Sequence, residues 1–255
     1  FKCDWSSDVC SSDLMNMMPV GLAVLAALVI TMLIGAFDGL IVARLRIAPF
    51  IVTLGMLSFA SGVAYWYSNS SPISWKSAPG AAFMTQVGIG KIFGIPTLAV
   101  IWIVMVLLAA FLMNKTTAGR ILYAIGGNSQ SALMLGINVK RTRFFSYLLS
   151  GVLSGIGGYV YLLHTGAGNA SNATAAEMQA IASAIIGGTL LTGGVGNVIG
   201  TLFGVLSLKT INNIVIASGL REPYWQSITT GLMLCFFILL QSVILTIREG
   251  SAGRD

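Results

Sequence analysis

The sequence predicts an all-α protein, a polytopic bundle of about seven transmembrane helices. Charged residues make up 9% of the chain and hydrophobic residues 56%, whereas roughly 25% of an average soluble domain is charged. The apolar residues are gathered into long runs, and a helix needs about 20 of them to cross the hydrocarbon. The 30 glycines fit the same class, because small residues let helix backbones approach closely inside a bilayer.

The first 14 residues differ from the rest of the chain. They read FKCDWSSDVCSSDL and contain an internal near-repeat. They have neither the basic start nor the apolar centre of a signal peptide, and they resemble translated sequencing-adapter sequence joined to a truncated reading frame. We therefore expect residues 1–14 to be non-native or disordered, with a short native polar tail as the alternative. Residues 15–247 are the predicted transmembrane domain.

Apolar segments along that domain give the predicted spans, which are 18–40, 50–67, 95–113, 144–163, 177–191, 198–217 and 225–247. The second ends in Tyr65-Trp66-Tyr67, an aromatic belt typical of a membrane–water boundary. The fourth carries the glycines expected to support close helix packing, namely Gly151, Gly155, Gly157 and Gly158. The fifth is short for a full crossing, so a re-entrant hairpin is the alternative there.

A polar run, residues 114–143, separates the third and fourth predicted spans and contains no acidic residue. Placing this run inside gives nine basic residues within and three outside, the asymmetry that the positive-inside rule expects. The inner set is Arg44, Arg46, Lys115, Arg120, Lys140, Arg141, Arg143, Arg248 and Arg254, and the outer set is Lys76, Lys91 and Arg221. The sequence thus predicts a cytoplasmic loop at 114–143 and a cytoplasmic tail at 248–255. The alternative is a surface turn whose basic residues are attracted to anionic lipid headgroups.

A short helix is predicted within this loop. Gly126-Gly127-Asn128 predicts a turn that accepts positive φ. Residues 129–135 then predict a helix with Ala132, Leu133 and Leu135 on an apolar face, and Gly136 predicts its C-terminal cap. A short helix with such a face suits a groove in a partner protein.

Several motifs, taken in order, resemble a known family. They are APFIVTLG at 48–55, LYAIGGN at 122–128, Ser131-Ala132, Leu135-Gly136-Ile137, AIASAIIGGT at 180–189, GGVGN at 193–197, Asn212-Asn213 and Trp225-Gln226. They resemble the permeases of bacterial ABC sugar importers of the ribose type, over about residues 21–245. The residues near 186–205 are most similar to galactofuranose permeases. That family has about ten spans, so the resemblance implies that the chain is truncated on its N-terminal side.

The resemblance implies a permease subunit in the bacterial inner membrane that carries a monosaccharide, a pentose or a hexose, with galactofuranose among the candidates. The partners implied are ABC ATPase subunits, a second permease copy or paralogue, a periplasmic sugar-binding protein and membrane lipid, but no nucleic acid. The coupling residues implied are Arg120, Gly126, Gly127, Asn128, Ser131, Ala132, Leu135, Gly136 and Ile137. Lys209, Asn212 and Asn213 are candidates for the translocation path, with snorkelling to the surface or bonding between helices as alternatives.

No catalytic or metal-binding set is expected in this chain, which has one histidine and eight acidic residues. It lacks the Gly-Lys-Ser/Thr of a P-loop, so ATP and Mg²⁺ are expected in a partner ATPase and no cofactor in the chain itself. The competing function is a stand-alone secondary transporter or channel. Acidic residues near mid-membrane would favour it, but Asp38 lies near the end of its span, where we expect a solvated or paired group.

Overall fold

The computed structural model describes residues 20–45, 47–69, 71–74, 84, 87–88, 90–92, 94–171, 176–190, 193–219 and 223–252. Its helices are α2 (Val20–Leu45), α3 (Pro49–Ser68), α5 (Thr97–Lys115), α6 (Thr117–Gly127), α7 (Ser129–Met134), α8 (Val139–Thr165), α9 (Ala176–Ile186), α10 (Val198–Ala217) and α11 (Pro223–Ala252). Its strands are β1 (Ile73–Ser74), β2 (Lys91–Ile92), β3 (Ile95–Pro96) and β4 (Ala167–Gly168). Residues 1–14 lie outside the described residues.

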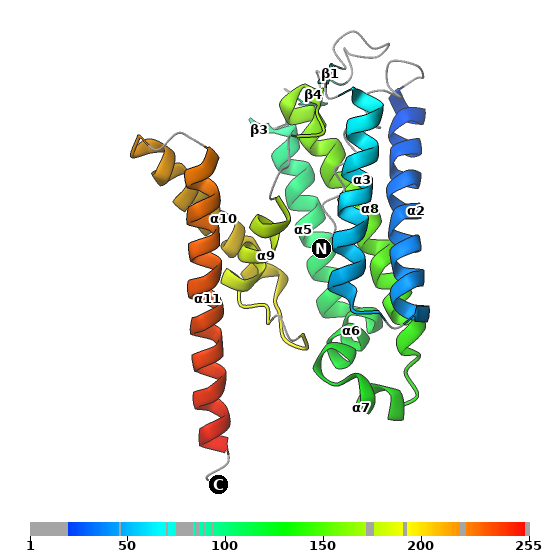
Figure 1. Ribbon diagram of the computed structural model, residues 1–255, viewed down its shortest axis with the longest axis vertical. Coiled ribbons are helices and arrows are strands. Elements are labelled where there is room, and N and C mark those ends of the chain that lie inside the picture. The colour runs from blue at the N-terminus through cyan, green and yellow to red at the C-terminus, as the bar shows by residue number, and fades with distance from the viewer. Residues whose placement is uncertain are drawn as a thin grey trace. The chain divides into compact units, whose positions relative to one another are not determined.

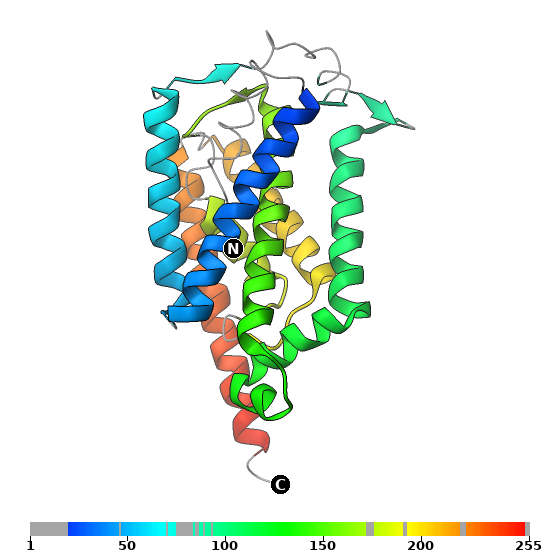
Figure 2. The same cartoon turned by 90° about the vertical axis from the view of Figure 1, so that its right-hand side faces the viewer.

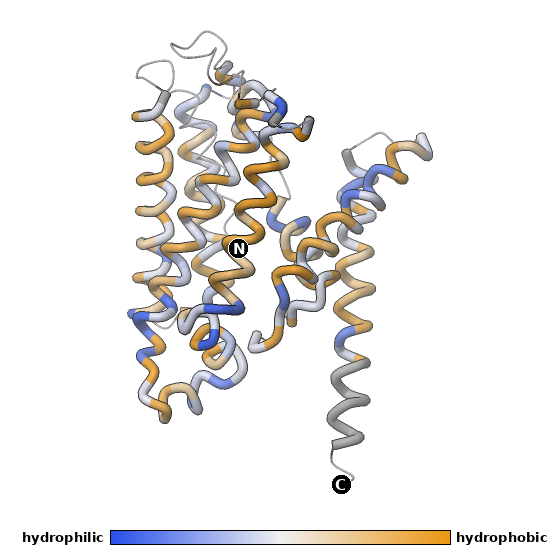
Figure 3. The backbone as a smooth tube through the Cα atoms, turned by 180° about the vertical axis from the view of Figure 1, so that it is seen from behind, coloured by the Kyte–Doolittle hydropathy of each residue, from blue (hydrophilic) through white to orange (hydrophobic). Residues whose placement is uncertain are grey.

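Among the described residues, six helices are long and apolar enough to cross a membrane: α2, α3, α5, α8, α10 and α11. They confirm the predicted all-α membrane bundle, and Figure 3 shows how apolar these helices are along much of their length. The fifth predicted span is the exception. It forms α9, which has only 11 residues and is therefore roughly 16 Å long, about half the thickness of the hydrocarbon layer. The described part thus holds six full-length spans rather than seven.

The chain divides into two compact units, Phe1–Met105 with Asn138–Thr174, and Val106–Ile137 with Ala175–Asp255. In the first unit α2 lies against α8, and their close approach depends on small residues (Figure 2). A Cβ on Gly35 would lie 2.8 Å from the Tyr147 carbonyl oxygen, and one on Gly151 would lie 2.6 Å from that of Thr31. The glycine-packing prediction holds for Gly151 and Gly155. Gly157 has nothing within 4 Å of its Cβ position, so it faces away from this contact.

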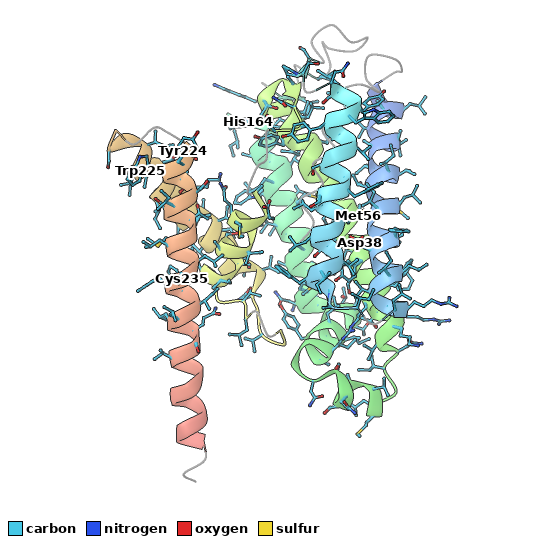
Figure 4. The ribbon with its side chains drawn as sticks, viewed as in Figure 1. Asp38, Met56, His164, Tyr224, Trp225 and Cys235 are labelled. Carbon is cyan, nitrogen blue, oxygen red and sulfur yellow. The ribbon has the colours of Figure 1, made fainter. Side chains whose placement is uncertain are left out.

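Asp38 is fully buried in α2 (Figure 4). Because Asp38 is buried, it is not a solvated carboxylate at the membrane surface, which was one of the two expectations from the sequence. The other expectation, a paired group, stays a prediction.

The ends of the spans in the first unit have the features of a membrane boundary. All three side chains of the Tyr65-Trp66-Tyr67 belt are exposed at the end of α3, as an aromatic girdle at a boundary requires. Beyond α3, β1 pairs antiparallel with β4, which follows α8 (Figure 1). This pairing ties together two segments almost a hundred residues apart in sequence.

In the second unit α9 and α10 form an antiparallel hairpin. A Cβ on Gly187 would lie 2.5 Å from the Thr201 Cα, and one on Gly204 would meet the Ser183 carbonyl oxygen. The α9 helix ends in a Schellman motif, because Gly188 has φ +86° and the Thr189 N–H donates to the Ala184 carbonyl.

The third helix of this unit, α11, supports the end of α9. The Gln241 side-chain Nε2 donates to the carbonyl oxygens of Ile185 at 3.2 Å and of Thr189 at 3.3 Å. Inside a bilayer no water is available to satisfy carbonyls that leave a helix. Gln241 therefore stabilises the place where α9 stops short.

Candidate functional site

The candidate coupling region begins where α5 gives way to α6. Thr116 separates them: its hydroxyl donates to the Leu112 carbonyl at 2.6 Å and accepts from the Gly119 N–H at 3.4 Å. This side-chain cap ends one helix and starts the next. The tight turn also requires Gly119, because a Cβ there would collide with the Met113 backbone. Residues 117–127 form a helix, α6, where the sequence indicated a loop.

The predicted short helix is present as α7, residues Ser129–Met134. The Asn128 Oδ1 caps it by accepting from the N–H groups of Gln130 and Ser131. At the other end Gly136 has φ +79°, its N–H donates to the Leu133 carbonyl, and the Ile137 N–H donates to that of Ala132. These two bonds form a Schellman motif, so Gly136 is the predicted C-terminal cap.

The predicted apolar face of α7 needs one correction. Leu133, Met134 and Leu135 are exposed by 64%, 83% and 78%. Ala132 is only 2% exposed, and its carbonyl accepts from the Ile137 N–H. The exposed apolar surface therefore consists of the last two helical residues and Leu135. Arg120 and Ser131 are also exposed.

Gly126 and Gly127 do not form the positive-φ turn that the sequence predicts, because both lie within α6. They are instead sites of close backbone contact. A Cβ on Gly126 would lie 2.5 Å from the Gly194 nitrogen, and one on Gly194 would lie 2.6 Å from the Gly127 Cα. The residues with positive φ are Gly193 and Gly194, on the opposite side of the contact.

The contact continues from these glycines to the start of α10. The Tyr123 hydroxyl of α6 donates to the Gly196 carbonyl at 2.9 Å. The next residue, Asn197, caps α10 by accepting from the Ile199 N–H at 3.0 Å. We call residues 193–197 the glycine turn. The glycine turn thus joins α6 directly to the α9–α10 hairpin, a contact that the sequence did not predict.

The three candidate path residues all lie on α10 but differ in their surroundings. The Lys209 side chain is exposed, and its Nζ lies 3.5 Å from the Gln179 Oε1 of α9, a bond between the two helices. Snorkelling of Lys209 stays a prediction. Asn212 is 5% exposed, and its Oδ1 has no hydrogen-bond partner. Asn213 is exposed. The described residues contain no group of three or more His, Cys, Asp or Glu that could hold a metal ion.

Comparison with known proteins places the chain in a family. Residues 9–238 match the permease component of the branched-chain amino acid transport system. The chain belongs to this permease family. No solved structure gives a significant match.

Several relatives within the permease family are curated proteins of Escherichia coli K12. The inner membrane ABC transporter permease protein YjfF is 36% identical over 84% of this chain and 65% of its own length. The ribose import permease protein RbsC is 34% identical over 86% of this chain and 68% of its own length. The galactose/methyl galactoside import permease protein MglC is 34% identical over 90% of this chain and 69% of its own length. The chain thus spans about two thirds of the length of these relatives, and the resemblance to ribose-type permeases is confirmed.

Proposed function

We propose that this chain forms the membrane-spanning permease subunit of an ATP-binding-cassette importer for a monosaccharide. Two relatives similar over most of the chain are named for the import of ribose and of galactose or methyl galactoside, which supports a pentose or hexose as the cargo. The galactofuranose assignment stays a proposal within that class. The importer would lie in the bacterial inner membrane among lipids that its apolar spans contact.

The observation that carries the proposal is the exposed apolar end of α7. Leu133, Met134 and Leu135 project from a capped helix that lies between two spans in the chain. Exposed apolar clusters bounded by polar residues commonly mark docking surfaces, and an ATPase groove would remove these side chains from water. Burial of one such side chain contributes about 1.5–3 kcal/mol, which is ample for a few residues to anchor a partner.

The glycine turn gives this docking surface a route into the membrane. Movement of α7 would be passed to α6, to which it is joined at Asn128. At Gly126 and Gly194 the backbones touch without an intervening side chain, and closely packed contacts transmit displacement because they have no space to absorb it. The α9–α10 hairpin would then move when the ATPase closes.

The contact between α6 and the glycine turn also supports the proposed orientation of the chain in the membrane. The 27 residues of α8 are enough for a crossing, so in the proposed topology α9 would begin on the side of the membrane opposite α7. The glycine turn lies beside α6, back on the α7 side. Residues 176–197 would therefore complete a crossing, half of it helical, rather than re-enter. In this arrangement α7 and the C-terminal tail are cytoplasmic.

The proposed complex contains a second permease copy or paralogue, two ATPase subunits that bind ATP with Mg²⁺, and a periplasmic sugar-binding protein. The chain itself would catalyse no covalent step. Its role is to bind the ATPase on the cytoplasmic side and to line the path of the sugar.

Copurification tests the docking surface. In the full-length permease, Leu135→Asp places a charge in the apolar surface, and we expect recovery of the ATPase subunit to fall at least tenfold, because a desolvated charge opposes docking. The matched control is Ser129→Asp, which adds the same charge to the first turn of the same helix, where an acidic residue is tolerated. Equal ATPase recovery with both variants would contradict the assignment of α7.

A further inference from the structure

Two buried polar atoms at one end of the α9–α10 hairpin have no hydrogen-bond partner. They are the Asn212 Oδ1 on α10 and the Glu177 Oε2 in the first turn of α9. Asn212 follows Gly204 and Leu208 on the buried face of α10, the face on which Gly204 meets α9. Asn212 therefore points toward the hairpin interface rather than toward the surroundings.

The register of the hairpin brings the two atoms to the same level. Ser183 lies opposite Gly204, and Gly187 lies opposite Gly200 and Thr201. Both helices rise by about 1.5 Å per residue, so the same antiparallel register can be extended toward the start of α9. It places the first turn of α9 beside residues 209–212. The Lys209–Gln179 bond, 3.5 Å long, joins the helices at this level.

Both atoms are acceptors, so each needs a donor. An unsatisfied buried carbonyl or carboxylate oxygen is costly, and two at one level of a hairpin require an explanation. Lys209, the ammonium at this level, donates to Gln179. A molecule with several hydroxyl groups could donate to both acceptors at once.

The two atoms lie at the level of the first turn of α9. α9 begins beside Asn212, whereas α10 continues for five more residues to Ala217. Within the hydrocarbon, a helix end is tolerated where it is enclosed by protein or faces a water-filled path. A hydrophilic solute moving along such a path would meet the first turn of α9.

From these observations we propose that Glu177 and Asn212 form a hydroxyl-binding site for a monosaccharide during its passage, with Lys209 and Gln179 flanking it. This inference rests on the proposed function as a sugar permease. It adds Glu177 and Gln179 to the path and excludes Asn213, whose side chain is exposed.

The test uses the full-length permease, reconstituted in proteoliposomes with its ATPase and binding protein. Uptake of radiolabelled ribose and galactose is compared with uptake of their singly deoxygenated analogues. The variants are Glu177→Gln, which keeps the side-chain shape, and Asn212→Leu. Asn213→Leu is the matched control, the same substitution at an exposed neighbour.

We expect Glu177→Gln and Asn212→Leu to lower kcat/KM for the parent sugar by about tenfold, the effect of losing one buried hydrogen bond. For at least one deoxy analogue, the two substitutions should lower kcat/KM less than they do for the parent sugar. The ratio of kcat/KM for the parent sugar to that for this analogue should therefore be smaller in the variants than in the wild type. Asn213→Leu should match the wild type. Equal losses for every analogue would indicate a structural role and overturn the site, as would wild-type behaviour of both variants. Failure of the wild-type complex to take up ribose, galactose or galactofuranose would instead contradict the proposed function.

Discussion

At the scale of single residues, glycine has different roles at positions that look alike in the sequence. Position 136 requires glycine because its φ is positive. Position 126 requires glycine because the backbone of Gly194 lies too close for a Cβ, and position 194 requires it for both reasons. The sequence predicted the first role, because a glycine after a short helix is a common cap. It could not predict the second, because the contacting backbones are almost seventy residues apart.

Gly194→Ala tests the double requirement. An alanine there would adopt φ +80° and place its Cβ 2.6 Å from the Gly127 Cα, so we expect the free energy of unfolding in detergent to fall by about 2–5 kcal/mol. Gly219→Ala is the control, since Gly219 has φ +91° and nothing within 4 Å of its Cβ position. That variant should lose only about 1–2 kcal/mol. Equal losses would show that the contact with α6 contributes nothing.

At the scale of helices, capping residues were easier to predict than helix lengths. Asn128 and Gly136 delimit α7 close to the predicted bounds, because their side-chain and backbone preferences act locally. The end of α9 at Ile186 was not predicted. Gly187-Gly188 is compatible both with a continuing transmembrane helix and with a cap, and the choice depends on the donor that α11 supplies. Likewise, the sequence indicates a loop where α6 forms, because glycines near both ends of this segment and its polar residues obscure an amphipathic helix.

Gln241→Leu tests how the end of α9 is stabilised. The substitution removes the donor to the Ile185 and Thr189 carbonyls, and we expect the free energy of unfolding to fall by about 1–3 kcal/mol. Thermal unfolding of the purified permease in detergent would measure it. Gln226→Leu, in the first turn of the same helix, should change stability less. If Gln241→Leu unfolded at the wild-type temperature, another group would have to satisfy those carbonyls.

At the scale of the whole molecule, length and hydropathy were enough to locate the six long helices. They could not show which helices contact one another, because a helix that is apolar on every side carries no preferred face. The contacts are set instead by small residues, such as Gly35 against Tyr147 in one unit and Gly204 against Ser183 in the other. Asn212 and Lys209, two of the residues predicted for the path, lie on the α9–α10 hairpin, and their place in the path stays a prediction.

Taken together, the exposed end of α7, the glycine turn and the polar end of the α9–α10 hairpin describe a route from an ATPase to a sugar. The account requires uptake to depend on ATP hydrolysis through α7. The most direct measurement is sugar uptake by proteoliposomes that contain the full-length permease and its ATPase, with and without ATP, for the wild type and for Leu135→Asp. We predict uptake by the wild type with ATP only, and none above background by the variant. Uptake that persists without ATP hydrolysis and follows an ion gradient would contradict the account and indicate a stand-alone secondary transporter.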